Sequence, residues 1–95
     1  MIYFVVNVYI DKVHGKGEYN DYIKAVKPIV EKYGGRYIIR SEKILFGDEN
    51  KPDRFIVIQF DSKWQLEQCF KSSEYLKIVD KRKNHVKSSA FIVEG

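Results

Sequence analysis

Three arginines and two tyrosines are the side chains best suited to binding a small ligand: Arg40, Arg54, Arg82, Tyr22 and Tyr75. A guanidinium group forks onto a carboxylate or a phosphate through two parallel hydrogen bonds. A tyrosine hydroxyl beside it can donate or accept a further hydrogen bond. These residues predict a site for a small anionic molecule. The alternative is that the arginines join subunits or pair with carboxylates of this chain, because arginine is also common at interfaces.

Asn7 is a sixth candidate, because it is the only polar residue inside an apolar strand from Ile2 to Ile10. A buried amide must find hydrogen-bond partners. Asn7 therefore either satisfies a neighbouring backbone group or faces a ligand pocket.

The sequence contains none of the common catalytic or phosphate-binding motifs, such as GxSxG, HExxH, the P-loop or the Rossmann fingerprint. His14 and His85 lack the spacing of metal ligands, and the single cysteine, Cys69, is expected to fill the core. We therefore predict no metal and no cofactor. The catalytic residues are unknown, and the sequence does not distinguish an enzyme from a binding protein.

Four strands and two helical regions must position these side chains. The strands are expected over Ile2–Ile10, Arg36–Phe46, Arg54–Phe60 and Lys87–Val93, because these runs are rich in β-branched and aromatic residues. The polar run from Gly47 to Asp53 predicts a turn that joins the middle two strands as a hairpin.

The first helix is predicted over Glu18–Tyr33 from apolar residues at i, i+3, i+4 and i+7. Gly34-Gly35 should end it, because glycine readily adopts the left-handed conformation of a helix C-cap. Ser62 with Gln65 predicts the start of a short second helix that packs Trp64 inward. A further helix is expected from Glu74 to about Lys83, with Leu76 among its inward residues.

The element order βαββαβ predicts an α+β fold of the ferredoxin-like kind, with one domain over residues 1–95. Both helices then cover one face of an antiparallel sheet and leave the other face bare. The first strand is apolar on both faces, so the bare face would be a large exposed apolar patch. We expect two copies to pack through this face as a homodimer, which makes a dimeric α+β barrel with the arginines near its mouth.

The net charge of +4 is concentrated in one segment, since seven basic and only three acidic residues lie between Lys63 and Lys87. A basic helix face is usually a solvated surface, although it can attract nucleic acid. No run is long enough to span a membrane. The lone cysteine and the absence of a signal peptide pattern predict a cytoplasmic protein.

The chain resembles the domain of unknown function 1330 family, within the dimeric α+β barrel superfamily. The resemblance covers nearly the whole chain and is carried by the following residues: Tyr33-Gly34-Gly35-Arg36-Tyr37, Arg40, Gly47, Arg54, Phe60, Ser72, Glu74-Tyr75, Arg82 and Val93-Glu94-Gly95. It implies the fold and the dimer, and it implies that Arg40, Arg54, Tyr75 and Arg82 are positions that the family keeps. The family has no known activity to transfer.

Three functions follow from these observations. The first is a homodimer with a small-molecule pocket by the sheet, which binds or transforms a small anionic ligand. The second is a nucleic-acid-binding protein that uses the basic helix face, and the third is an interaction module without a ligand. Fold alone does not choose among them, because one fold hosts many functions.

Overall fold

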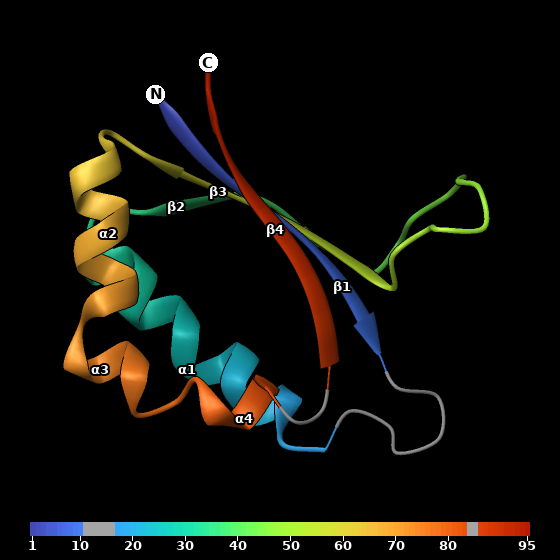
Figure 1. Ribbon diagram of the computed structural model, residues 1–95, viewed down its shortest axis with the longest axis horizontal. Coiled ribbons are helices and arrows are strands. Elements are labelled where there is room, and N and C mark those ends of the chain that lie inside the picture. The colour runs from blue at the N-terminus through green and yellow to red at the C-terminus, as the bar shows by residue number, and fades with distance from the viewer. Residues whose placement is uncertain (11–16, 84–85) are drawn as a thin grey trace.

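A computed structural model of the chain describes residues 1–10, 17–83 and 86–95. One four-stranded antiparallel sheet carries the helices on one of its faces (Figure 1). The elements in chain order are β1 (Ile2–Ile10), α1 (Tyr19–Lys32), β2 (Arg36–Ser41), β3 (Arg54–Phe60), α2 (Lys63–Lys71), α3 (Ser73–Leu76), α4 (Asp80–Lys83) and β4 (Val86–Glu94). The strand order β2-β3-β1-β4 confirms the predicted ferredoxin-like α+β fold.

The two faces of β1 are equally apolar in sequence, so the sequence does not indicate which face the helices cover. The structure settles this through the strand register. Val8 is buried, and Phe4 and Val6 also pack toward the helices. Because side chains alternate along a strand, Asn7 lies on the opposite face. There it pairs across the sheet with Phe55 of β3 and Ser89 of β4.

Helix α1 ends as its sequence predicts. Gly34 adopts a φ of 86°, and its N–H donates to the Glu31 carbonyl at 3.1 Å. Gly35 allows close packing, because a Cβ at this position would lie 2.5 Å from Cγ1 of Val30 and 2.9 Å from the ring of Phe60. The two glycines therefore end the helix and bring its last turn against the sheet.

The second helical region differs from the prediction after α2. Ser62 caps α2 as predicted, since its Oγ accepts a hydrogen bond from the Gln65 N–H at 3.2 Å. The predicted single helix over 74–83 is wrong, because the chain forms two short helices, α3 and α4, separated by a turn. In this turn the Ile78 N–H reaches back only three residues, to the Tyr75 carbonyl, and within α4 the Arg82 N–H does the same to the Val79 carbonyl. These three-residue turns change the direction of the chain, so that Arg82 approaches the sheet and bonds to Ser88 of β4. None of the helices in the described ranges is long and apolar enough to cross a membrane.

Strand β2 is shorter than predicted, because it ends at Ser41 rather than Phe46. Ser41 already pairs with Phe55, at the start of β3, so the residues that follow have no partner strand. Residues 42–53 instead form an arm that projects from the body of the molecule (Figure 1). Leu45 and Phe46 on this arm are more than nine-tenths exposed.

The core lies between the sheet and the helices. Val30, Phe60 and Cys69 are completely buried at its centre. Two residues predicted to face inward do not, since Trp64 is 67% and Leu76 57% exposed. Their neighbours in the same helices supply the packing instead, which leaves these two side chains on the outer surface.

Candidate functional site

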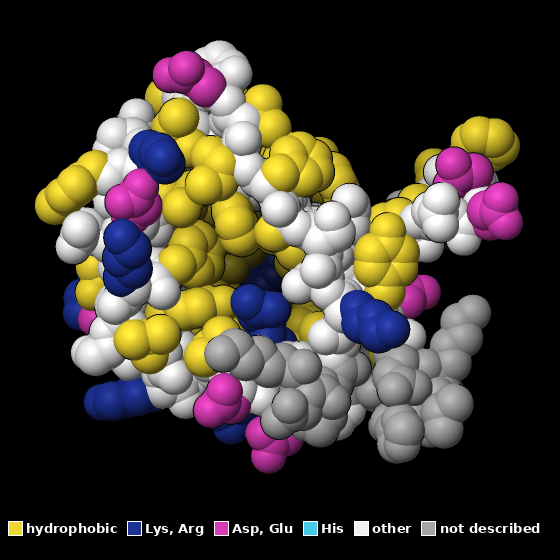
Figure 2. Space-filling view, viewed as in Figure 1, with side chains coloured by type: hydrophobic (Ala, Val, Ile, Leu, Met, Phe, Trp, Pro, Cys, Tyr) yellow, Lys and Arg dark blue, Asp and Glu magenta, His cyan; other side chains and the backbone are white. Residues whose placement is uncertain are grey.

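A pocket opens between the sheet and the helices, on the covered face of the sheet rather than the bare one. Figure 2 shows it as a hollow with apolar walls and basic side chains within it. Its cavity volume is about 60 Å³. The lining residues come from all four strands and from α1, α2 and α4, with one contribution from α3: Phe4, Val6, Val8, Tyr19, Tyr22, Val26, Tyr37, Ile56, Ile58, Phe70, Tyr75, Arg82, Val86, Ser88 and Ala90.

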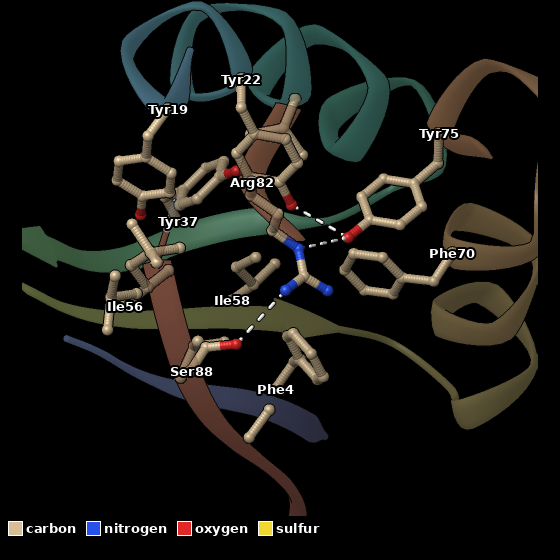
Figure 3. Close-up of a pocket in the computed structure, with 15 residues that line it drawn as sticks. Phe4, Tyr19, Tyr22, Tyr37, Ile56, Ile58, Phe70, Tyr75, Arg82 and Ser88 are labelled. Atoms are coloured by element: carbon tan, nitrogen blue, oxygen red, sulfur yellow. Dashed lines mark hydrogen bonds between the residues drawn. The ribbon is translucent and has the colours of Figure 1, made fainter. Parts of the chain in front are cut away.

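The polar groups of the pocket form one hydrogen-bonded cluster (Figure 3). The hydroxyls of Tyr22 and Tyr75 are 3.0 Å apart. Arg82 donates from Nε to the Tyr75 hydroxyl at 3.2 Å and from Nη1 to Oγ of Ser88 at 3.3 Å. Arg82 is the only charged side chain among the described residues that line the pocket. The guanidinium group is therefore fixed between two neutral oxygens, and its Nη2 donates to no described residue.

Helix α3 holds Tyr75 in position. Ser72 precedes this helix, and its Oγ accepts a hydrogen bond from the Tyr75 N–H at 3.1 Å. The Tyr75 ring meets Phe70 edge-on, with ring centres 4.9 Å apart and planes at 88°. Aromatic pairs favour this arrangement, so the cap and the ring contact together orient the hydroxyl toward Arg82.

Two tyrosines of the pocket, Tyr22 and Tyr37, have raised pKa values. Burial raises the pKa of Tyr37 to about 12. For Tyr22, burial and the adjacent Tyr75 raise the pKa well above its usual range. Both hydroxyls therefore keep their protons near neutral pH. The pocket consequently carries the positive charge of Arg82 without a negative charge among its described lining residues.

Arg40 and Arg54 face the helices but do not line this pocket. Arg40 donates from Nη2 to the Ile23 carbonyl at 2.6 Å, and its guanidinium stacks over the Tyr37 ring at 4.9 Å. Arg54 is buried and pairs with Glu42 at 3.5 Å, which is the alternative role that the sequence left open. Both arginines act here as supports for α1 and the hairpin rather than as groups that face the cavity.

Asn7 is also separated from the pocket, because it points away from the helices. Of the six predicted site residues, the structure thus brings together Tyr22, Tyr75 and Arg82 and leaves Asn7, Arg40 and Arg54 outside. The expectation that arginines lie at the mouth of a barrel built by two sheets does not describe this pocket, which each chain forms from its own sheet and helices.

Sequence reasoning missed several lining residues, chiefly Tyr19, Tyr37, Phe70 and Ser88. Tyr19 lies on the same apolar stripe as Tyr22, so the periodicity of the helix could have identified it. The others carry no such signal, because their contribution depends on how the strands and helices cross.

Other reactive groups give no second chemical centre in the described part of the chain. Burial raises the pKa of the Cys69 thiol to about 11, so it stays protonated and unreactive. No group of three or more His, Cys, Asp or Glu side chains in residues 1–10, 17–83 and 86–95 could hold a metal ion. His14 and His85 lie outside the described residues. On α2, the basic side chains of Lys63 and Lys71 both pair with Glu67, which partly neutralises the basic face.

Several solved structures share this fold. The RPA0582 protein of unknown function from Rhodopseudomonas palustris is 17% identical, with a TM-score of 0.77 over 99% of this chain and 81% of that chain. A protein assigned as an antibiotic biosynthesis monooxygenase from Nitrosomonas europaea is 11% identical, with a TM-score of 0.70 over 100% and 98% of the two chains. SnoaB, a cofactor-independent oxygenase from Streptomyces nogalater, is 9% identical, with a TM-score of 0.69 over 99% and 91%.

These likenesses show the fold alone, because the identities are low. No curated protein matches the sequence. The family described as a domain of unknown function, DUF1330, matches residues 1–95, the whole length of the chain. The three pocket residues Tyr22, Tyr75 and Arg82 thus lie in a protein that belongs to the DUF1330 family.

Proposed function

We propose that this protein binds, and in doing so positions for reaction, a small and partly apolar anion in the pocket around Arg82. The observation that carries the proposal is that this guanidinium group is partly withdrawn from water without a paired carboxylate. It is half-buried among aromatic side chains, and no carboxylate of the described residues pairs with it. A charge withdrawn from water is costly unless an opposite charge accompanies it.

A ligand anion would supply the missing charge. Nη2 of Arg82 has no hydrogen-bond partner among the described residues, and Figure 3 shows the guanidinium pointing into the cavity, close to Phe4 and Phe70. The walls around it are apolar, as is usual in pockets that bind small organic molecules. The site therefore combines one fixed cation with apolar surface, which suits an anion that has an apolar body.

Relatives by fold give the proposal a context. SnoaB, which shares this fold at 9% sequence identity, is described as a cofactor-independent oxygenase. This likeness is a fold-level analogy and says nothing of the reaction. A bound ligand that is recovered unchanged would define a binding protein, whereas turnover of the ligand would define an enzyme.

The test is a screen of small organic anions and neutral molecules by protein-observed NMR, followed by titration of the hits. We expect anions to shift the signals of pocket residues and Arg82→Gln to weaken their binding by roughly 10- to 100-fold, the range for a hydrogen bond to a charged group. Lys77→Gln is the matched control, because it removes an equal charge from an exposed residue of the same segment. Hits that bind equally to both variants would contradict the proposed site.

We also propose that two copies pair through the bare face of the sheet. Three of its residues leave much of their side chains exposed in one chain: Ile39, Phe91 and Val93, at 42%, 49% and 40%. These residues belong to two opposite edges of the same face, so the exposed apolar surface spans the whole sheet. Sedimentation over a range of concentrations should show a dimer, and a monomer at every concentration would exclude this pairing.

A further inference from the structure

We propose that the polar end of the ligand is a carboxylate, carried by a single aromatic ring or a branched aliphatic body. This inference rests on the proposed function, since it identifies the molecule for which the pocket is built. It is carried by a count of the hydrogen-bond donors, acceptors and charges that face the cavity.

The two tyrosine hydroxyls leave one proton unused. Tyr22 and Tyr75 share a single hydrogen bond, so one hydroxyl donates to the other and only one of their two protons is engaged. Arg82 does not take up the second proton, because it donates to the Tyr75 oxygen and has no acceptor to offer. Whichever hydroxyl donates, the other proton has no acceptor among the described residues.

Arg82 and Ser88 also carry protons that no described residue accepts. Nη2 of Arg82 carries two hydrogens without an acceptor in the described part of the chain. Ser88 accepts from Nη1, so its own proton also remains to be donated. The lining residues among the described ranges include no Asp, Glu, Asn, Gln or His. A ligand group that only accepts hydrogen bonds fits this surface best, because it can take up these free protons. An amide or alcohol would bring a donor of its own, which only the hydroxyl oxygens of the described lining could accept.

The charge count favours a carboxylate over a phosphate. The described lining holds one cation, Arg82, and no anion. A carboxylate carries one negative charge, which Arg82 neutralises. A phosphate monoester carries about −1.5 to −2 charges and three acceptor oxygens, so it would leave negative charge uncompensated in an apolar pocket.

The walls and the volume define the rest of the molecule. Next to Arg82 lie the rings of Phe4, Phe70 and Tyr22, and the Phe4 and Phe70 ring centres are 4.8 Å apart. Aromatic rings and branched alkyl groups pack well on such surfaces. A cavity of about 60 Å³ holds about four to six water molecules, at roughly 10–15 Å³ each. This space takes up the carboxylate and the adjoining part of a small ligand, and the rest of the molecule extends toward the opening of the pocket.

The experiment compares benzoate, benzamide, phenyl phosphate and 3-methylbutanoate by isothermal titration with the full chain. We expect both carboxylates to bind, and benzamide and phenyl phosphate to bind roughly 10- to 100-fold more weakly than benzoate. Arg82→Gln should remove the preference for benzoate over benzamide, and Lys77→Gln should preserve it. Arg82→Lys should retain part of the preference, because it keeps the charge and loses the fork.

The tyrosine pair provides a second test. Tyr22→Phe and Tyr75→Phe each leave one hydroxyl whose proton is free, so each change alone should lower benzoate affinity less than the double change does. The double variant should lose roughly tenfold, the lower end of the range for a hydrogen bond to a charged group. Circular dichroism of each variant checks that the fold is intact, and the ligand series on the unaltered chain decides the question even where a variant does not fold.

The outcomes separate the two proposals. Tighter binding of phenyl phosphate would overturn the carboxylate inference and leave the anion pocket in place. Equal binding of benzamide and benzoate would overturn both the carboxylate and the requirement for an anion. Benzoate binding that neither Arg82→Gln nor the double tyrosine change affects would place the ligand elsewhere and overturn both. The absence of binding by all four probes would also overturn both, because the pocket would then hold neither of the carboxylates that are expected to fit it.

Discussion

At the scale of single residues, the pocket is organised by one guanidinium and two hydroxyls that hold one another in place. Arg82 bonds to Tyr75, and Tyr75 lies against Tyr22. Each of these side chains also forms an aromatic or cation–π contact, including Arg82 over the Tyr22 ring at 5.8 Å. A ligand would therefore meet groups that are already oriented, which lowers the entropic cost of binding.

Buried titratable groups make a prediction for alkaline pH. Burial raises the pKa of Cys69 from 9.0 to about 11 and that of Tyr37 from 10.0 to about 12. Above pH 9 the unfolded chain loses these protons first, so it binds fewer protons than the folded chain and stability falls as the pH rises. Urea unfolding should show full stability below pH 9 and a progressive loss between pH 9 and 12.

The variant Cys69→Ala isolates the contribution of the thiol to this pH dependence. It removes the only cysteine, so the decline between pH 9 and 11 should be shallower than in the unaltered chain. An identical slope in the two proteins would mean that the folded thiol titrates as freely as the unfolded one. The comparison concerns the slope alone, because the smaller side chain also leaves a cavity.

At the scale of elements, the site depends on turns that set the direction of each helix. Gly34 and Gly35 seat the end of α1 on β3, and Ser72 starts α3 just where Tyr75 must enter the pocket. The turn between α3 and α4 then brings Arg82 back toward β4. The positions of the three polar pocket residues, Tyr22, Tyr75 and Arg82, therefore depend on these three short connections.

Gly35→Ala should destabilise the protein by about 1–3 kcal/mol, the usual range for overpacking a core. The added Cβ would lie 2.5 Å from Val30 and 2.9 Å from Phe60, both of which are fully buried. Gly47→Ala is the matched control, since its Cβ would meet only the flexible side chain of Lys51 on the exposed arm. Equal stability of the two variants in urea would show that Val30 and Phe60 shift to accommodate the added Cβ at little cost.

Ser72→Ala should cost about 1 kcal/mol, because it removes the cap of α3. It should also weaken ligand binding, since the cap orients Tyr75. Ser73→Ala, at the exposed neighbouring position, should change neither quantity. A loss of stability without any change in affinity would indicate that ring packing alone positions Tyr75.

At the scale of the whole molecule, the sheet has one face covered by helices and one face that is bare. The termini lie side by side at one end, where Met1 and Gly95 exchange hydrogen bonds at 3.1 and 3.0 Å (Figure 1). The covered face holds the pocket and the bare face is the proposed pairing surface. Ligand binding and pairing are thus assigned to opposite faces, so they can be disrupted separately.

Phe91→Glu should therefore shift the sedimentation coefficient toward a monomer without abolishing ligand binding. The change places a charge on β4, at one edge of the apolar bare face, where a pairing partner would desolvate it. Leu76→Glu is the matched control, because Leu76 is similarly exposed but belongs to the helical layer. A dimer that survives Phe91→Glu and dissociates with Leu76→Glu would assign the pairing to the helices.

Local sequence by itself determined most of the elements and the ends of α1, but not the end of β2 or the break between α3 and α4. The apolar stripe of α1, the glycines that end it and the serine that caps α2 are all local signals, and the structure confirms them. The order of these elements sufficed for the ferredoxin-like topology, since few arrangements satisfy it. Tyr22, Tyr75 and Arg82 were also identifiable as candidates from residue type.

Tertiary structure alone decided which candidates share a site. Strand β1 is apolar on both faces, so only its register against β3 and β4 placed Asn7 on the bare side. Arg40 and Arg54 resemble Arg82 in sequence terms, yet a backbone carbonyl and a carboxylate engage them. The break between α3 and α4 brought Arg82 to the cavity. Such choices depend on contacts between segments far apart in the chain, and no local pattern encodes those contacts.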